Sequence, residues 1–469
     1  MKKIGKKGIF AIIAVTVLLI FWLAPVISGL TKDAMLFLGI FFWTLIMLAV
    51  NVLPMEITML LSLGLIMATG ICPFTTTFSQ FSGTTVWLLI AVFGFGTAVA
   101  NSGLLARLAL YVMKLFPQTY NGRLLATMTA GAIISPLVPN LSAKAVIMCP
   151  IAGALGDEAG YEPRSKGQAG LFMGAYIASG MFGNTWLTGS LGVPLVLMFV
   201  DPMSWFGWLS ATWLWGIIIL VGMYFFLRFY YDPKDKTEKE NKLSKEEKNK
   251  AINERIAALG PISRKEIITA VILVISMVLW MTEKYHGMAT VTVTLLAFCA
   301  LAICGLFTTM DFMTKVAWPL IIMVGAILGL TSVMSYVGIN DWISAYLGPV
   351  ILKFASNPYV LVTVVYLISA GLWMLFINMV TTMMVITAVF TPIAATVGIN
   401  PFVPIFVAMI AAQLWVWKAQ SSSLLAGLGV MGDRVDHSQT VPSAIAWFFI
   451  DFVACIASIP VWHMIGFIA

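Results

Sequence analysis

The chain has 469 residues, of which 60% are hydrophobic and 10% are charged, and its mean hydropathy is +0.97. Soluble globular domains carry about 25% charged residues, so this composition excludes an ordinary soluble domain. The formal net charge of +7 arises from basic residues at the N-terminus and in one central loop. Because this is the distribution of the positive-inside rule, the charge does not indicate nucleic acid as a partner.

Apolar windows of about 20 residues recur along the chain, and a helix needs that length to cross a bilayer. The sequence therefore predicts an all-α polytopic membrane protein, embedded in a lipid bilayer, with about 11 transmembrane helices. Residues 1–30 hold the first helix, because no small-residue cleavage site follows its Lys-rich start. The predicted spans are 9–28, 34–53, 55–71, 85–102, 168–200, 205–227, 266–283, 288–306, 316–338, 403–431 and 443–468.

The long hydrophilic segment at residues 229–265, rich in Lys and Glu, divides the chain into two repeats, 31–228 and 266–469. An even number of crossings precedes this segment, so a cytoplasmic N-terminus places it in the cytoplasm, as its basic charge requires. The C-terminus is then predicted outside. No Arg- and Ser-rich transit peptide is recognisable, which predicts a bacterial plasma (inner) membrane.

The two repeats share short motifs at an offset of about half the chain. The motif Phe74-Thr-Thr matches Phe307-Thr-Thr, and the motif that begins at Trp186 matches the one that begins at Trp417. Each repeat has an odd number of predicted spans, so the repeats must be inverted in the membrane. Inverted repeats with interrupted helices are typical of secondary transporters, which bind substrate near the bilayer midplane.

Each repeat contains two apolar segments that polar or helix-breaking residues interrupt. We predict re-entrant hairpins at residues 123–157 and 359–399, and broken helices at 168–200 and 403–431. The N-terminal ends of half-helices attract anionic oxygens, so the breaks together predict an anion site with approximate two-fold symmetry. For any single break, helix packing or a proline kink is the alternative.

Two lysines lie within these breaks, Lys144 in the first hairpin and Lys418 in the second broken helix. A lysine at bilayer depth costs roughly 2.5 to 3.5 kcal/mol, which favours a functional role; the alternative is that each side chain snorkels to an interface. The predicted substrate-binding residues are Asn140, Ser142, Lys144, Thr188, Gly189, Thr381, Thr382, Lys418, Ser421, Ser422 and Ser423.

No catalytic or metal-binding pattern is recognisable. The five cysteines have no metal-ligand spacing, and no HExxH helix, GxSxG elbow or P-loop occurs, so we predict neither an enzyme nor a bound cofactor or metal. Asp451, in the last span, is predicted to be paired or near an interface, and a proton relay remains the alternative.

The stretch Phe78-Ser-Gln-Phe-Ser-Gly-Thr-Thr-Val-Trp, followed by Ser102-Gly-Leu-Leu-Ala-Arg, resembles the divalent anion/sodium symporter family, and the resemblance extends over essentially the whole chain. It implies homodimers whose subunits each have a scaffold domain and a transport domain that moves as an elevator. Family members carry Ser-Asn-Thr at each hairpin tip. This chain departs from that pattern, with Asn140-Leu-Ser at the first tip and Thr381-Thr at the second.

The exchanger branch of the family is the closer match. It includes citrate/succinate and tartrate/succinate antiporters and plastid 2-oxoglutarate/malate translocators, and its first tip resembles Pro-Ser-Asn-Thr-Ala-Arg. Here Pro139-Asn-Leu-Ser-Ala-Lys places Lys144 at the Arg position. By the same analogy, Lys418 lies in the loop that would complete the second sodium site.

A lysine ammonium in a sodium site fills the site and repels the ion. The resemblance therefore implies sodium-independent exchange of C4 or C5 dicarboxylates of the 2-oxoglutarate, malate, succinate and fumarate type, with Lys144 and Lys418 in place of sodium ions. A sodium-coupled symporter is the alternative within transport, and an anion channel or a non-transporting receptor is the alternative from another class. The sequence ranks neither the dicarboxylates nor the direction of net exchange.

Overall fold

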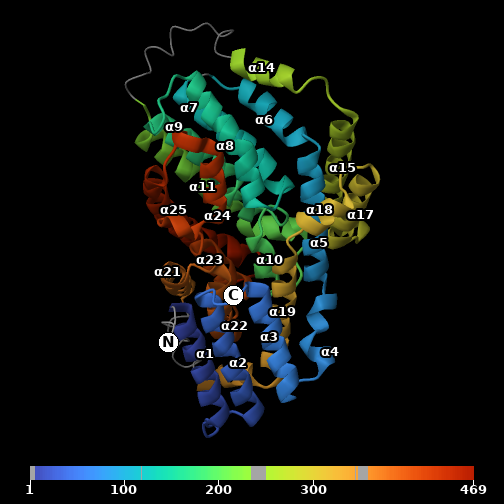
Figure 1. The fold of residues 1–469 in the computed structure, drawn as a ribbon, viewed down its shortest axis with the longest axis vertical. Helices are drawn as coiled ribbons and strands as arrows, with labels where there is room; N and C mark the ends of the chain where they lie inside the picture. The colour runs from blue at the N-terminus through green and yellow to red at the C-terminus, as the bar shows by residue number, and fades with distance from the viewer. Residues whose placement is uncertain (1–5, 118, 234–249, 344, 347–356) are drawn as a thin grey trace, which may run out of the picture.

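The computed structural model describes residues 6–117, 119–233, 250–343, 345–346 and 357–469. Helices dominate this part of the chain (Figure 1). The all-α, multi-pass prediction is confirmed, whereas the number of spans stays a prediction. Within the described residues six helices are long and apolar enough to cross a membrane: α2 (Lys32–Ala49), α5 (Thr84–Asn101), α11 (Trp205–Tyr230), α19 (Trp318–Tyr336), α21 (Pro358–Phe376) and α25 (His437–Met464).

Helices from the start of each repeat pack together into what we call bundle one. Here α2 contacts α1 and α3, α19 packs on α3, and α17 packs on α5 and α15. Small polar groups join neighbouring helices, as where Thr44 and Ser62 share a buried hydrogen bond of 2.7 Å. Its other elements are α1 (Lys6–Leu23), α3 (Met55–Thr69), α4 (Phe74–Thr77), η1 (Ser79–Ser82), α15 (Arg264–Met281), α16 (Glu283–His286), α17 (Thr290–Ile303) and α18 (Thr309–Thr314).

The remaining membrane helices form bundle two, in which α11 packs along α25 and α9 packs on both α7 and α8. Figure 1 shows the green and red ribbons of this bundle interleaved, so elements far apart in sequence lie side by side. Its other elements are α7 (Tyr120–Ile134), η2 (Ser135–Leu137), α8 (Leu141–Glu158), α9 (Lys166–Ser179), η3 (Met181–Thr185), α10 (Gly192–Leu197), α22 (Met379–Thr396), α23 (Phe402–Ala411), η4 (Lys418–Gln420), α24 (Ser422–Met431) and η5 (Gly432–Arg434).

Helix breaks fall inside each predicted interruption. Pro136 and Pro139 separate α7 from α8, and Asn140 begins the new helix as its N-cap. Between α21 and α22 the chain turns at Ile377, whose φ of 52° is unusual for a β-branched residue. The stretches 168–200 and 403–431 each contain two α-helices joined by a loop that includes one short 3-10 helix, η3 or η4. Bundle two therefore carries four helix starts inside apolar segments.

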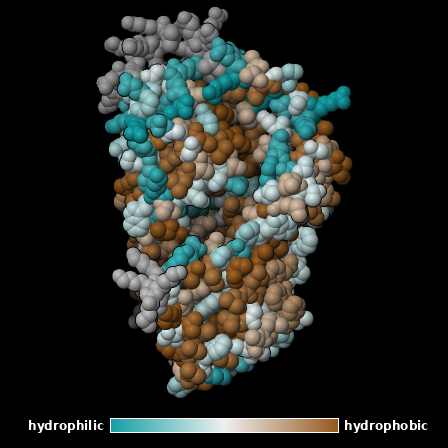
Figure 2. Space-filling view, viewed as in Figure 1, coloured by the Kyte–Doolittle hydropathy of each residue, from teal (hydrophilic) through white to brown (hydrophobic). Residues whose placement is uncertain are grey.

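An amphipathic helix, α6 (Leu104–Lys114), connects the two bundles. It packs on α7, α14 (Lys250–Ala258) and α15, and its buried Arg107 donates from Nε to Glu266 Oε1 at 2.6 Å. The predicted linker at 229–265 lies partly outside the described residues. Figure 2 shows hydrophilic side chains gathered at the α14 end and hydrophobic side chains over much of the remaining face, as expected for a protein in a bilayer.

Candidate functional site

A cavity of about 220 Å³ lies within bundle two, where the four helix breaks meet. Both repeats contribute to it, and every lining residue belongs to bundle two. The lining residues are Asn140, Leu141, Ser142, Met181, Ser190, Leu191, Gly192, Trp373, Met379, Ala412, Gln413, Leu414, Gln420, Ser421, Ser422 and Ser423.

Three helices of ten or more residues, α8, α22 and α24, begin at this cavity, and the short helix α10 also begins there at Gly192. Asn140 caps α8 by accepting from Ala143 N at 3.1 Å, and Ser421 caps α24 by accepting from Leu424 N at 3.1 Å. The first residue of α22, Met379, also lines the cavity. The N-terminal end of a helix carries a partial positive charge and unpaired N–H groups. Three such ends around one cavity favour an anionic ligand.

Lys144 is fully buried one turn into α8, and its Nζ donates to Gly189 O at 2.6 Å. Gly189 belongs to the loop between η3 and α10, which a second bond from Thr188 Oγ1 to Pro136 O at 2.8 Å also ties to the first hairpin. These three predicted site residues lie together at the junction of hairpin and loop. They do not line the cavity, which begins one helical turn away at Asn140 and Ser142.

Lys418 and the two threonines of the second hairpin also lie outside the lining. Lys418 is exposed on η4, the turn that supplies Gln420 to the cavity. Thr382 is buried and donates back to Asn378 O at 3.1 Å. Thr381 is buried, and its hydroxyl has no hydrogen-bond partner among the described residues. In this structure the Lys418 side chain is therefore exposed rather than enclosed by the protein.

The serines of the second broken helix line the cavity and are held by a tyrosine from the first repeat. Ser421 and Ser423 each share a hydrogen bond of 3.0 Å with the Tyr176 hydroxyl, and Ser422 lies between them in the lining. Tyr176 is fully buried on α9. The contact fixes the start of α24 against the other repeat.

Sequence reasoning missed two glutamines that line the cavity, and the groups that hold them. Gln413 Oε1 accepts from Asn184 Nδ2 at 2.8 Å, and Gln420 Oε1 accepts from Trp417 N at 2.8 Å. A signal existed, because Gln413 is a carboxamide in an apolar segment at bilayer depth. Its partner lies in the other repeat, and nothing in the local pattern points to it.

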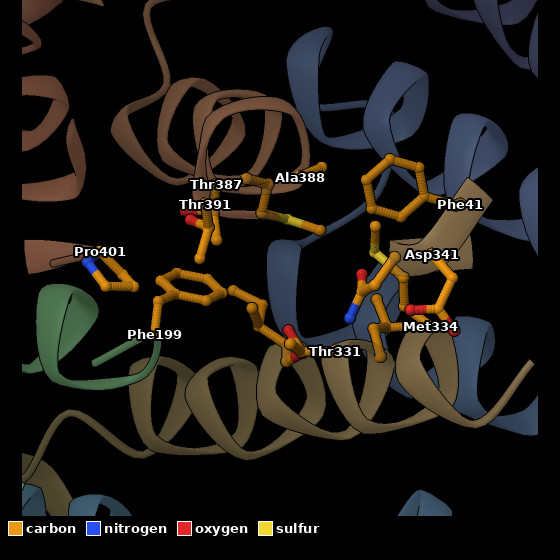
Figure 3. A pocket seen from close by; sticks show the side chains of 13 residues that line it. Phe41, Phe199, Thr331, Met334, Asp341, Thr387, Ala388, Thr391 and Pro401 are labelled. Atoms are coloured by element: carbon orange, nitrogen blue, oxygen red, sulfur yellow. The ribbon is translucent and has the colours of Figure 1, made fainter. Parts of the chain in front are cut away.

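A second cavity, of about 290 Å³, lies between the bundles. Figure 3 shows Thr387 and Thr391 of α22 on one side, with Thr331 and Met334 of α19 opposite. The remaining lining is mostly apolar, and Asp341 adds a carboxylate. A negative charge and an apolar wall disfavour an anion, so the first cavity is the better candidate for an anion site.

Asp451 is fully buried on α25 and accepts from Trp215 Nε1 at 2.7 Å. Its other oxygen, Oδ2, has no hydrogen-bond partner among the described residues. The group lies away from the cavity lining and joins α25 to α11. In the described part of the chain, no cluster of three or more His, Cys, Asp or Glu residues is placed to hold a metal ion.

The family described as "Sodium:sulfate symporter transmembrane region" matches residues 6–426. Dicarboxylate transporter 1, chloroplastic, of Arabidopsis thaliana is 24% identical over 96% of this chain and 80% of its own length. The inner membrane protein YbhI of Escherichia coli is 25% identical over 72% of this chain and 73% of its length. Among solved structures, the Alcanivorax borkumensis YdaH transporter has a TM-score of 0.56 at 13% identity over 84% of this chain and 88% of that one, a likeness of fold alone.

These matches confirm the family resemblance and the prediction that the protein is a transporter and not an enzyme. The family match covers most of the chain, including both hairpins and the cavity. The chain therefore belongs to the sodium:sulfate symporter family of membrane transporters.

Proposed function

We propose that this protein exchanges C4 or C5 dicarboxylates across the plasma membrane without sodium, by movement of bundle two against bundle one. The observation that carries the proposal is the cavity at which α8, α22 and α24 begin, beside the buried Lys144 ammonium. Helix N-termini and a buried cation match a dianion. The names of the similar chloroplast proteins support dicarboxylates as the substrate class.

The contact between Lys144 and Gly189 supports the idea that an ammonium replaces a sodium ion. A sodium ion at the junction of a hairpin and a broken helix would take backbone carbonyl oxygens as ligands. Here a carbonyl oxygen of the broken helix, that of Gly189, accepts from the Lys144 ammonium of the hairpin instead. The positive charge is thus part of the chain and cannot be released with the substrate.

This fixed charge accounts for obligate exchange. Moving bundle two without substrate would carry an uncompensated ammonium past an apolar barrier, and removing one partner of a buried ion pair costs about 3 to 5 kcal/mol. The loaded carrier avoids that cost. A symporter, in contrast, releases its sodium with the substrate and can return empty.

In the proposal Lys418 acts as the second positive charge for the dianion. Its exposure in this structure limits the effect, because a solvated ammonium is screened by water and salt. Of the remaining predicted residues, Asn140, Ser142 and Ser421 to Ser423 would bind the substrate from the cavity wall. Thr188, Gly189, Thr381 and Thr382 would hold the hairpin tips and loops that carry these groups.

Movement of bundle two as one body is consistent with its contacts. All the cavity lining belongs to bundle two, so substrate and site can move together. Its most extensive helix contacts with bundle one are those of α2 with α22, α5 with α10 and α11 with α15. We further propose a homodimer in the bacterial inner membrane, with the N-terminus in the cytoplasm and the C-terminus outside.

The experiment is uptake of labelled 2-oxoglutarate into proteoliposomes that are either empty or preloaded with succinate, in sodium or potassium buffer. We expect uptake only into preloaded vesicles and equal rates in the two buffers. The family's description favours a second candidate, sodium-coupled symport. Sodium-driven uptake into empty vesicles would establish that candidate and overturn exchange. Flux that does not saturate would indicate a channel, and binding without flux would indicate a receptor.

A further inference from the structure

The two glutamines of the cavity are both oriented by the protein, and the orientation of Gln413 follows from hydrogen-bonding chemistry alone. Asn184 Nδ2 lies 3.0 Å from Met181 O and 2.8 Å from the Gln413 side chain. A backbone carbonyl only accepts, so the Asn184 atom that faces it must be the nitrogen. The Gln413 atom that faces this nitrogen must therefore be Oε1.

The Gln413 amide nitrogen is left for the cavity. Among the described residues Nε2 of Gln413 has no acceptor, and Gln413 lines the cavity beside Gly192. Asn184 itself is 1% exposed and does not line the cavity, so it acts only through Gln413. Asn184, from the first repeat, thus fixes the orientation of the Gln413 amide, from the second repeat, so that its Nε2 atom faces the ligand.

Gln420 repeats the arrangement on the neighbouring wall. The backbone N–H of Trp417 donates to Gln420 Oε1 at 2.8 Å, which fixes the oxygen away from the ligand. Its Nε2 lies 3.1 Å from Met374 Sδ, and a thioether sulfur is a weak acceptor. Both cavity glutamines therefore present N–H donors with no strong acceptor among the described residues.

We infer that these two amide donors select dicarboxylates whose substituent can accept a hydrogen bond, such as an oxo group, and reject those that carry an ammonium group. An oxo oxygen can accept from Gln413 or Gln420, whereas an ammonium group only donates and would face donors. A site built of oriented hydrogen-bonding groups discriminates strongly, since the wrong ligand leaves buried groups unpaired. Asn184 is the positioning residue. The inference rests on the proposed function and names the substrate class of the same cavity.

The test compares three C5 dicarboxylates of equal chain length: glutarate, 2-oxoglutarate and L-glutamate. Each is offered as the external substrate to glutarate-loaded proteoliposomes, and the ratio of the 2-oxoglutarate rate to the L-glutamate rate is measured. We expect the wild-type ratio to be at least about tenfold, the effect of one hydrogen bond to a well-positioned donor. The rate of glutarate exchange shows whether the protein still transports a C5 dicarboxylate that has no substituent.

Two variants reverse the chemistry of the donor. Gln413→Glu keeps the contact with Asn184 and turns an acceptor toward the cavity, so the ratio should fall about tenfold or more. Asn184→Asp should act in the same direction at a pH at which the introduced carboxyl is ionised, because a carboxylate can only accept and Gln413 must then present Oε1 to the ligand. Gln413→Met, which has no amide, should weaken the discrimination and leave only the contribution of Gln420. Asn101→Asp, in bundle one, is the matched control and should leave the ratio unchanged.

The outcomes separate this inference from the proposed function. Glutarate exchange with equal rates for 2-oxoglutarate and L-glutamate, or a ratio that Gln413→Glu and Asn184→Asp leave unchanged, would overturn the inference while the carrier function stands. Failure of the wild-type protein to exchange any of the three would overturn both. If a variant exchanges too slowly to measure, ligand-induced shifts in its melting temperature give the same ratio of affinities.

Discussion

The Nζ atom of Lys144 lies 2.6 Å from the carbonyl oxygen of Gly189, across the junction between the first hairpin and the first broken helix. Both groups are buried, and the contact joins elements that are separated by 45 positions in the chain. A charge that holds two parts of a binding site together affects both the shape and the potential of the site.

Removal of this charge should weaken substrate binding. We expect Lys144→Ala to raise the half-saturation concentration for 2-oxoglutarate at least about tenfold, because hydrogen bonds to charged groups contribute about 1.5 to 3 kcal/mol. Lys114→Ala, at the exposed end of α6, is the matched control and should have no effect. Unchanged half-saturation in Lys144→Ala would show that the lysine has no part in binding.

A smaller polar side chain at the same position should test the replacement of sodium directly. In Lys144→Ser the Gly189 carbonyl loses its cation, and a hydroxyl becomes available as a cation ligand. We expect 2-oxoglutarate exchange by this variant to become faster in sodium than in potassium buffer. Equal rates in the two buffers would count against the idea that the ammonium occupies a former cation site.

The exposed Lys418 should contribute less than Lys144, and its contribution should depend on salt. Lys418→Ala is expected to raise the half-saturation concentration only a few-fold at low ionic strength, because the charge acts through solvent. Titration with potassium chloride should remove the difference between variant and wild type. A large effect that persists at high salt would mean that Lys418 becomes enclosed in another state of the carrier.

The Asn140 cap should matter for both stability and binding. Asn140→Ala removes the acceptor for Ala143 N and should cost about 1 kcal/mol of stability, and it also removes a polar group from the cavity. Thr31, which caps α2 in bundle one with the same geometry, provides the control. Thr31→Ala should lower the melting temperature similarly and leave the half-saturation concentration unchanged.

We expect Asp451 to stabilise the fold and to have no role in transport. Asp451→Asn keeps an acceptor for Trp215 Nε1 and removes any negative charge from the interior, so exchange and thermal stability should be retained. Asp451→Leu leaves the indole N–H without its partner and should lower the melting temperature. Abolished exchange in Asp451→Asn, with the melting temperature intact, would instead assign the carboxyl a part in transport.

The sequence predicted the class of fold because lipid imposes simple rules. Apolar length, the basic linker and the polar interruptions all follow from the cost of unpaired polar groups in hydrocarbon. The same reasoning pointed to Asn140 and to Ser421 to Ser423, which line the cavity. It pointed there because prolines and serines change the local backbone whatever their distant neighbours are.

Side-chain direction was harder to predict, because it depends on contacts between the repeats. Polarity alone could not tell that Lys144 reaches Gly189, or that Lys418 is exposed on η4. Gln413 was missed because its meaning depends on Asn184, in the other half of the chain. Pairings across an inverted repeat have no signature in a single sequence.

Residues 467–469 pack against the segment that follows α22, at the C-terminal end of the second hairpin. Asn400 N donates to Phe467 O at 2.7 Å, Ala469 N donates to Gly398 O at 3.1 Å, and Ile399 and Ile468 form an isolated bridge. Helix α1, in contrast, packs on α2 in bundle one. The distance between two spectroscopic labels, one on α1 and one near residue 469, would therefore change when bundle two moves relative to bundle one. Measuring this distance during transport would follow the displacement in real time.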